Sequence, residues 1–198
     1  IDQGMTDDGA TPLFIAAQNG HLEVVKCLVE RGANKDQGTT DTGLTPLCMA
    51  AQEGHLDVVR FLVGSGANKD HCMADPGITP LYIAAQEGHP EVVRFLIESA
   101  ANIDQGRAND RATPLCIAAQ EGHLEVVRLL VGSGANKDQG KTDDGATPLH
   151  IAAAEGHLEV VRLLVESGAN KDQGRANDGG TPLLMAAHQG QICECMVL

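Results

Sequence analysis

The tripeptide Thr-Pro-Leu recurs in this chain at a constant interval of 34 residues. The copies begin at Thr11, Thr45, Thr79, Thr113, Thr147 and Thr181. A unit of this length is shorter than the roughly 40 residues that lone domains usually need, so each copy must bury its apolar side chains against its neighbours. The interval therefore predicts a stack of similar units with a long exposed surface, which suits binding better than catalysis.

The composition narrows the class of partner. Fourteen basic and 27 acidic residues give a formal net charge of −13. Nucleic acid and anionic membranes carry charge of the same sign, so neither is expected as a partner. A basic partner is favoured, although the same acidic excess also promotes the solubility of an elongated protein.

The six cysteines show no framework spacing. They are Cys27, Cys48, Cys72, Cys116, Cys193 and Cys195. Cys48 and Cys116 share a repeat position two units apart, and a stack would hold them too far apart to bridge. We therefore expect unpaired cysteines in a reducing compartment inside the cell, the cytoplasm or the nucleus. No apolar run of about 18 residues is present, so no membrane span is expected.

The copy from 147 to 180 illustrates the local structure that one repeat encodes. Thr147 is a good N-cap, and Pro148 suits the first position of a helix because its missing N–H would have no partner there. This helix is expected to end at Gly156, and a second one to run from near Leu158 to Gly168. The polar stretch 169–180, rich in Gly, Asn and Asp, predicts a projecting turn, here called the finger.

The residues of this copy resemble the ankyrin repeat in order and spacing. The matching segments are Thr147-Pro148-Leu149-His150, Ala152-Ala153, Gly156-His157, Glu159-Val160-Val161 and Gly168-Ala169. The resemblance implies an all-α fold, a solenoid of stacked helix-turn-helix units with projecting β-hairpin or turn fingers. It also implies a curved array whose concave side binds other proteins, and no catalytic activity.

The resemblance predicts one domain over residues 1–198. Its parts are a partial finger at 1–10, repeats at 11–44, 45–78, 79–112, 113–146 and 147–180, and a truncated repeat at 181–198, as in a fragment of a longer array. The period exceeds the usual 33 residues by one, so a longer finger is expected. Ala100 replaces a helix-ending Gly, which should cost about 1 kcal/mol if the backbone keeps positive φ there.

Residues that could suggest chemistry have simpler explanations. One histidine per repeat follows the same helix-ending Gly, which predicts a structural role at the turn: His21, His55, His89, His123 and His157. Cys193 with Cys195, and His71 with Cys72, lack the paired spacing of a zinc site. The Asp-rich fingers lack the alternating carboxylates of a calcium loop. We therefore expect no enzyme activity, no metal and no cofactor.

The resemblance places partner contacts just before each Thr-Pro-Leu and near the end of each first helix. These positions are Asp41, Leu44, Gln52, Glu53, Asp75, Ile78, Gln86, Glu87, Asp110, Gln120, Glu121, Asp143, Asp144, Ala154 and Glu155. Their acidic character, with apolar steps at Leu44 and Ile78, predicts that a monomer binds a basic segment of another protein with marked salt dependence. Because Gln-Glu recurs unchanged at three of these sites, a structural spacer or spring between other domains remains the alternative.

Overall fold

A computed structural model describes residues 2, 9–70 and 78–190. This part of the chain contains eleven α-helices and no strand, which confirms the all-α prediction. It divides into two compact units, Ile1–Asn102 and Ile103–Leu198, here called unit 1 and unit 2. The expectation of a single domain over 1–198 stays a prediction.

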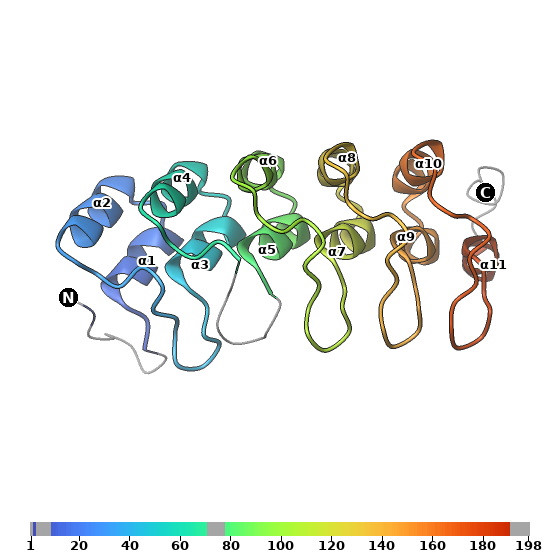
Figure 1. The fold of residues 1–198 in the computed structure, drawn as a ribbon, viewed down its shortest axis with the longest axis horizontal. Helices are drawn as coiled ribbons and strands as arrows, with labels where there is room; N and C mark the ends of the chain where they lie inside the picture. The colour runs from blue at the N-terminus through green and yellow to red at the C-terminus, as the bar shows by residue number, and fades with distance from the viewer. Residues whose placement is uncertain (1, 3–8, 71–77, 191–198) are drawn as a thin grey trace. The chain divides into compact units, whose positions relative to one another are not determined.

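Unit 1 consists of three helix pairs. They are α1 (Pro12–Gln18) with α2 (Leu22–Glu30), α3 (Pro46–Gln52) with α4 (Leu56–Gly64), and α5 (Pro80–Glu87) with α6 (Pro90–Glu98). The first helix of each pair, here called the inner helix, packs beside the inner helix of the next pair, and the second, outer helices form their own row. Figure 1 shows the two rows, with the finger around residues 38–43 extending from the row of inner helices.

Unit 2 repeats this arrangement. Its helices are α7 (Pro114–Glu121), α8 (Leu124–Gly132), α9 (Pro148–Glu155), α10 (Leu158–Glu166) and α11 (Pro182–His188). The inner helices α7, α9 and α11 pack in sequence, and the outer helix α10 packs on α8 (Figure 1). Each unit is therefore a stack of similar layers.

The predicted helix ends are confirmed. The hydroxyl of Thr45 accepts the N–H of Cys48 at 3.3 Å, and the same cap occurs at every inner helix, always with Pro in first position. Gly156 ends α9 with φ +81°, and Gly168 follows α10 with φ +82°. Pro90 opens α6, where a proline is tolerated.

The core comes from small and medium apolar side chains. In the second repeat Leu47, Ala50 and Ala51 of the inner helix are completely buried, as are Val59 and Leu62 of the outer helix. The corresponding side chains of the third, fourth and fifth repeats are buried in the same way. The paired alanines allow the close approach of helices that the sequence indicated.

One histidine per repeat links adjacent layers. The Nε2 atom of His55 lies 2.9 Å from the carbonyl oxygen of Gln18, and that of His89 lies 2.8 Å from the carbonyl of Gln52. In unit 2, His157 makes the same contact to Gln120 at 2.9 Å. The role is structural, as predicted, but the hydrogen bond runs to the preceding repeat rather than within the turn of the histidine itself.

A second ladder joins the layers through Asn and Asp. The carboxylate of Asp36 accepts the backbone N–H of Asn68 in the next repeat at 2.8 Å, and that of Asp138 accepts the N–H of Asn170 at 2.8 Å. Within a repeat, the side-chain oxygen of Asn68 accepts the N–H of Asp70 at 3.1 Å. These contacts explain why Asn and Asp recur two residues apart after the outer helices.

Cys48 corrects the expectation of unpaired cysteines. Cys27 and Cys116 are free thiols, and burial raises the pKa of Cys116. Cys48, in contrast, is disulfide-bonded. The sequence argument considered only cysteines at one repeat position, which a stack keeps apart, and not a bond between different positions.

Candidate functional site

Within each described finger a short loop is closed by two backbone hydrogen bonds, and the finger is identified here by the residues of that loop. In the finger 140–145, the N–H of Lys141 donates to the carbonyl of Ala146 at 3.1 Å and the N–H of Gly145 donates to that of Lys141 at 2.9 Å. The fingers that begin at residues 38, 106 and 174 have the same pair. They are tight loops without strands, so the described part shows the turn form of the predicted fingers rather than β-hairpins.

The fingers of unit 2 are also tied to each other. The N–H of Thr142 donates to the carbonyl of Asp110 at 2.8 Å, and the N–H of Ala176 donates to that of Asp144 at 2.8 Å. A guanidinium nitrogen of Arg175 lies 3.7 Å from the carboxylate of Asp144 on the preceding finger. Neighbouring fingers of this unit therefore form a linked surface.

The finger carboxylates are largely occupied within the protein. Asp110 accepts two hydrogen bonds from Arg107, at 3.2 and 2.5 Å, and one from the N–H of Ala112 at 3.0 Å. Partial burial opposes ionisation of Asp110, but these donors outweigh it and hold its pKa below the usual value. A hydrogen bond from Arg175 is the main cause that lowers the pKa of Asp178.

Leu44 and Ile78, the two large apolar residues of the predicted surface, take part in the packing of unit 1. Leu44 is half-buried and packs against two buried clusters, one that contains Phe14 and Met49 and one that contains Ile83. Ile78 is half-buried and packs against the cluster that contains Ile83. These side chains belong to the apolar packing of unit 1, so their substitution would disturb folding as well as any contact with a partner.

The glutamates at the ends of the inner helices are exposed. These are Glu53 and Glu87 in unit 1 and Glu121 and Glu155 in unit 2. None forms an ion pair with a described residue, whereas Glu125 on the outer helix lies 3.5 Å from Arg128. Each unit therefore presents uncompensated negative charge along one edge of its inner helices.

A cleft of about 150 Å³ opens in unit 2 between the fingers and the inner helices. It is lined by Gln120, Lys141, Asp144, Ala146, His150, Ile151, Ala154, Glu155, Arg175 and Met185. Two small side chains make the space. Ala146 stands where unit 1 has Leu44 and Ile78, and Ala154 stands where four other repeats have Gln.

His150 is one of the residues that line this cleft, and its side chain is almost fully buried. Its Nδ1 atom accepts the N–H of Thr147 at 3.3 Å and lies 2.8 Å from the Thr147 hydroxyl, while Nε2 lies 3.0 Å from the carbonyl oxygen of Gly180. With Nδ1 as acceptor, Nε2 carries the proton that is donated to Gly180. Burial is the main cause that lowers the pKa of His150, so the neutral ring is favoured.

The cleft gathers only part of the predicted contact surface. Four predicted residues line it: Gln120, Asp144, Ala154 and Glu155. Asp41, Gln52, Gln86 and Asp143 lie elsewhere, exposed or half-buried, and Asp75 lies outside the described residues. The prediction omitted Lys141, Ala146, His150, Ile151, Arg175 and Met185. The available signal was the coincidence of two shortened side chains, Ala146 and Ala154, in one repeat.

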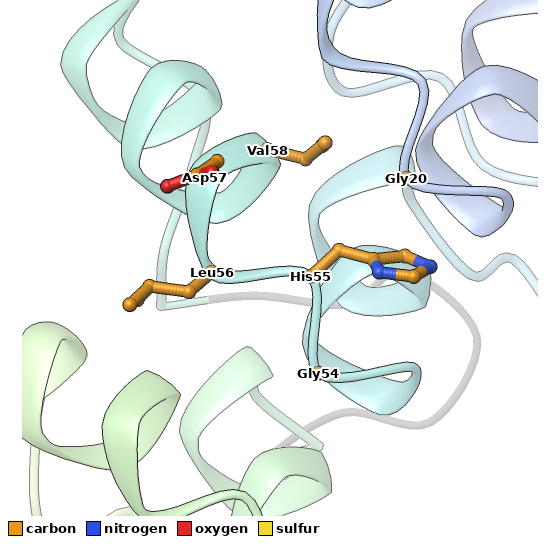
Figure 2. Close-up of a pocket in the computed structure, with 6 residues that line it drawn as sticks. All are labelled: Gly20, Gly54, His55, Leu56, Asp57 and Val58. Carbon is orange, nitrogen blue, oxygen red and sulfur yellow. The ribbon is translucent and has the colours of Figure 1, made fainter.

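A different kind of opening recurs where the inner helix turns into the outer one. In unit 1 it measures about 370 Å³ and is lined by Gly20, Gly54, His55, Leu56, Asp57 and Val58. Figure 2 shows the His55 ring pointing towards Gly20, whose missing Cβ makes room, since an added one would lie 2.8 Å from the ring. An opening of about 410 Å³ occupies the same repeat position in unit 2, so this feature belongs to the repeat itself.

The described residues contain neither a cluster of metal ligands nor a membrane-spanning helix. No group of three or more His, Cys, Asp or Glu side chains is placed to hold a metal ion there. No helix in the same ranges is long and apolar enough to cross a membrane.

Comparison with protein families agrees with the repeat seen in the structure. A family model described as ankyrin repeats in three copies matches residues 1–72, 67–141 and 134–197. A comparison with curated proteins finds no match. The matched stretches contain all the helices and fingers described above.

Proposed function

This chain belongs to the ankyrin-repeat family, and on that premise we propose that it is a non-catalytic module that binds a basic segment of another protein. Ankyrin repeats generally mediate protein–protein interaction. The segment would lie along the fingers and the ends of the inner helices. In unit 2 it would cover the cleft above His150.

The observation that supports this proposal is the row of exposed glutamates that form no ion pair with a described residue. Two of them, Glu87 and Glu121, accept a hydrogen bond from the neutral amide of the preceding glutamine, which leaves their charge uncompensated. Glu121 and Glu155 lie at the ends of adjacent inner helices in unit 2, and Glu53 and Glu87 take the same place in unit 1. The formal charge of −13 adds a long-range attraction for cations. A basic segment would therefore gain in association rate and in specificity.

A matched pair of variants tests the position of this surface. Glu121→Gln with Glu155→Gln removes two charges from the inner helices, and Glu125→Gln with Glu159→Gln removes two from the outer helices. Binding of a fluorescent lysine-rich peptide is measured by anisotropy at low and high salt. Each inner-helix charge should contribute roughly 0.2 to 1 kcal/mol, so the first variant, which removes two of them, should bind about two- to thirtyfold more weakly.

The outer-helix variant should bind the peptide nearly as well as the unmodified protein. Equal losses in both variants would show that net charge alone attracts the peptide, and the proposed surface would be wrong. Absence of peptide binding to the unmodified protein at low salt would overturn the basic-segment proposal itself.

One observation favours a second function, a structural spacer between other domains. The pair Gln-Glu is identical at 52–53, 86–87 and 120–121, where residues that discriminate between partners should differ. A spacer requires no ligand on this surface. Substitution of Glu53 and Glu87 would then leave every co-purifying protein in place, whereas the binding proposal expects a partner to be lost.

We also propose that the protein is a monomer inside the cell, in the cytoplasm or the nucleus. Light scattering over a range of concentrations tests the first point, because a monomer keeps one mass. Localisation of a fluorescent fusion of the full-length protein tests the second.

A further inference from the structure

We infer that the segment bound by unit 2 carries residues of both charges at the cleft, an acidic one that faces Lys141 and a basic one that faces Glu155. This inference rests on the proposed function, because it assigns the charge pattern of the segment at one place on the same surface. It distinguishes recognition of a charge pattern from a general attraction for cations.

The lining of the cleft is mostly polar, and its charged groups come from two sides. Six of its ten lining residues are polar or charged. Lys141 and Asp144 belong to the finger 140–145 and Arg175 to the next finger, whereas Glu155 is the last residue of the inner helix α9. A charged side chain of the segment is therefore the expected occupant.

Two of the four charged side chains already compensate each other. A guanidinium nitrogen of Arg175 lies 3.7 Å from the carboxylate of Asp144, and the same guanidinium donates to Asp178 on its own finger. Asp144 also accepts the N–H of Ala146 at 2.9 Å. These two side chains link neighbouring fingers, which leaves Lys141 and Glu155 to a ligand.

Lys141 differs from the arginines at the same position of the neighbouring fingers. Arg107 donates to both carboxylate oxygens of Asp110 in its own finger, and Arg175 makes the equivalent contact. An ammonium cannot form the two parallel hydrogen bonds of a guanidinium. Lys141 forms no ion pair with any described residue, and Asp144 of its own finger lies near Arg175 instead.

The surroundings of Lys141 favour an anionic partner. Lys141 is half-buried, so protein has replaced part of the water around it. Its charge helps to lower the pKa of Asp110, but that carboxylate is already bound by Arg107. A carboxylate of the segment can therefore pair with Lys141 directly, while the exposed Glu155 offers the same opportunity to a cation on the helix side.

The two available charges have opposite sign and lie on different sides of the cleft, so they orient the segment. A basic residue on the finger side meets the like charge of Lys141, and an acidic residue on the helix side meets that of Glu155. In unit 1 the residues at the position of Lys141 are uncharged, Thr39 and Met73. The charge pattern is therefore a property of unit 2.

The experiment uses two lysine-rich peptides that differ only at one central residue, which is glutamate in one and glutamine in the other. Their affinities for the unmodified protein and for Lys141→Met are measured by fluorescence anisotropy. The side chain of Lys141 makes no ion pair with a described residue, so this variant should fold normally, which circular dichroism checks. Arg128→Met is the matched control, because it removes one positive charge from the outer helix of the same repeat, away from the proposed contact surface.

We expect the glutamate peptide to bind the unmodified protein about two- to fivefold more tightly than the glutamine peptide, although its net charge is less positive. Lys141→Met should abolish this preference, because only the repulsion between the glutamate and the acidic protein remains. Arg128→Met should keep it. High salt should reduce the preference in the unmodified protein, since ions screen the pair.

The outcomes separate this inference from the proposed function. If the unmodified protein binds the glutamate peptide no more tightly than the glutamine peptide, a basic segment is bound but the charge pattern is wrong. The pattern is also wrong if Lys141→Met leaves the preference unchanged, or if Arg128→Met reduces it equally. If neither peptide binds the unmodified protein, both proposals fail together.

Discussion

The finger at 38–43 in unit 1 and the fingers of unit 2 use different chemistry at the same two repeat positions. In unit 1 the hydroxyl groups of Thr39 and Thr42 lie 2.8 Å apart. In unit 2 these positions hold Arg107 with Asp110, Lys141 with Asp144, and Arg175 with Asp178. The residue beneath differs as well, since unit 1 has the half-buried Leu44 where unit 2 has Ala112 and Ala146.

This difference shows that repeats of the same fold can be stabilised near the finger by different interactions, apolar packing in one and ion pairs in another. In unit 1 Leu44, which directly follows the finger at 38–43, packs against two clusters of buried side chains. Unit 2 holds its fingers with ion pairs and with backbone hydrogen bonds between fingers. Its small residues then leave a cleft open to a ligand.

The largest expected effect is the loss of packing in unit 1. Leu44→Ala should lower the free energy of unfolding of this unit by about 2 kcal/mol, the low end for such truncations because Leu44 is only half-buried. The protein contains one tyrosine and no tryptophan, and Tyr82 lies buried in unit 1. Tyrosine fluorescence during urea denaturation therefore reports on this unit.

The reverse change in unit 2 is the control. Ala146→Leu fills an existing cleft and should change stability far less than Leu44→Ala does. If Leu44→Ala proves neutral, apolar packing is not what supports the finger of unit 1.

The second effect in size concerns the charged fingers. Asp110→Ala removes the acceptor of Ala112 and of Arg107 and should cost about 1 kcal/mol in unit 2. Thr42→Ala removes only a hydroxyl pair and a long contact of 3.5 Å to the N–H of Leu44, so it should cost less. Urea denaturation followed by circular dichroism compares the two, and equal losses would contradict the distinction between the units.

The acid response of Asp110 follows from its lowered pKa. The contribution of ionised Asp110 to the free energy of unfolding is complete above the unfolded pKa of 3.8, and it is lost as the pH falls through the lower folded pKa. The difference in stability between Asp110→Ala and the unmodified protein should therefore shrink in strong acid.

The helices were predictable because their signals are local. Thr-Pro fixes the start of each inner helix, and glycines with positive φ fix the ends, without reference to residues far away in sequence. The family resemblance rested on the same signals. The family match over three stretches confirmed it.

The cleft and the inter-repeat ladders were not predictable in the same way. Asp144 lies near the guanidinium of Arg175, which is 31 residues further along the chain on the next finger, and not near the ammonium of Lys141 on its own finger. The same limit applies to His55, whose acceptor is a backbone carbonyl 37 residues away. Backbone acceptors leave no trace in residue identity, so only the folded arrangement shows them.

A third, smaller effect compares the two non-glycine residues with positive φ. Ala100 in unit 1 has φ +59° and Arg111 in unit 2 has φ +57°, each at a position where other repeats have Gly. The expected strain at Ala100 is thus confirmed in its backbone angle. Ala100→Gly and Arg111→Gly should each raise stability by up to about 1 kcal/mol.

The two substitutions should act on different units. Ala100→Gly should delay the tyrosine fluorescence transition of unit 1, and Arg111→Gly should leave that transition unchanged. A loss of stability in either variant would mean that its side chain contributes more than the backbone strain costs.

The smallest effect near neutral pH belongs to His150, a position that Cys48 occupies in unit 1. Burial lowers the pKa of His150 below 6.5, and the positive charge of Arg175 acts in the same direction. As the pH falls through 6.5 the unfolded chain binds more protons than the folded one. The contribution of the neutral His150 ring to the free energy of unfolding is therefore complete above that pH and declines towards the lower folded pKa. The loss between pH 7 and 6 should stay below about 1 kcal/mol. His150→Leu introduces the residue that the last repeat has at this position, Leu184. It should remove this part of the pH dependence of the free energy of unfolding, measured by urea denaturation. An unchanged pH dependence would show that the histidine has the same pKa in the folded and the unfolded chain.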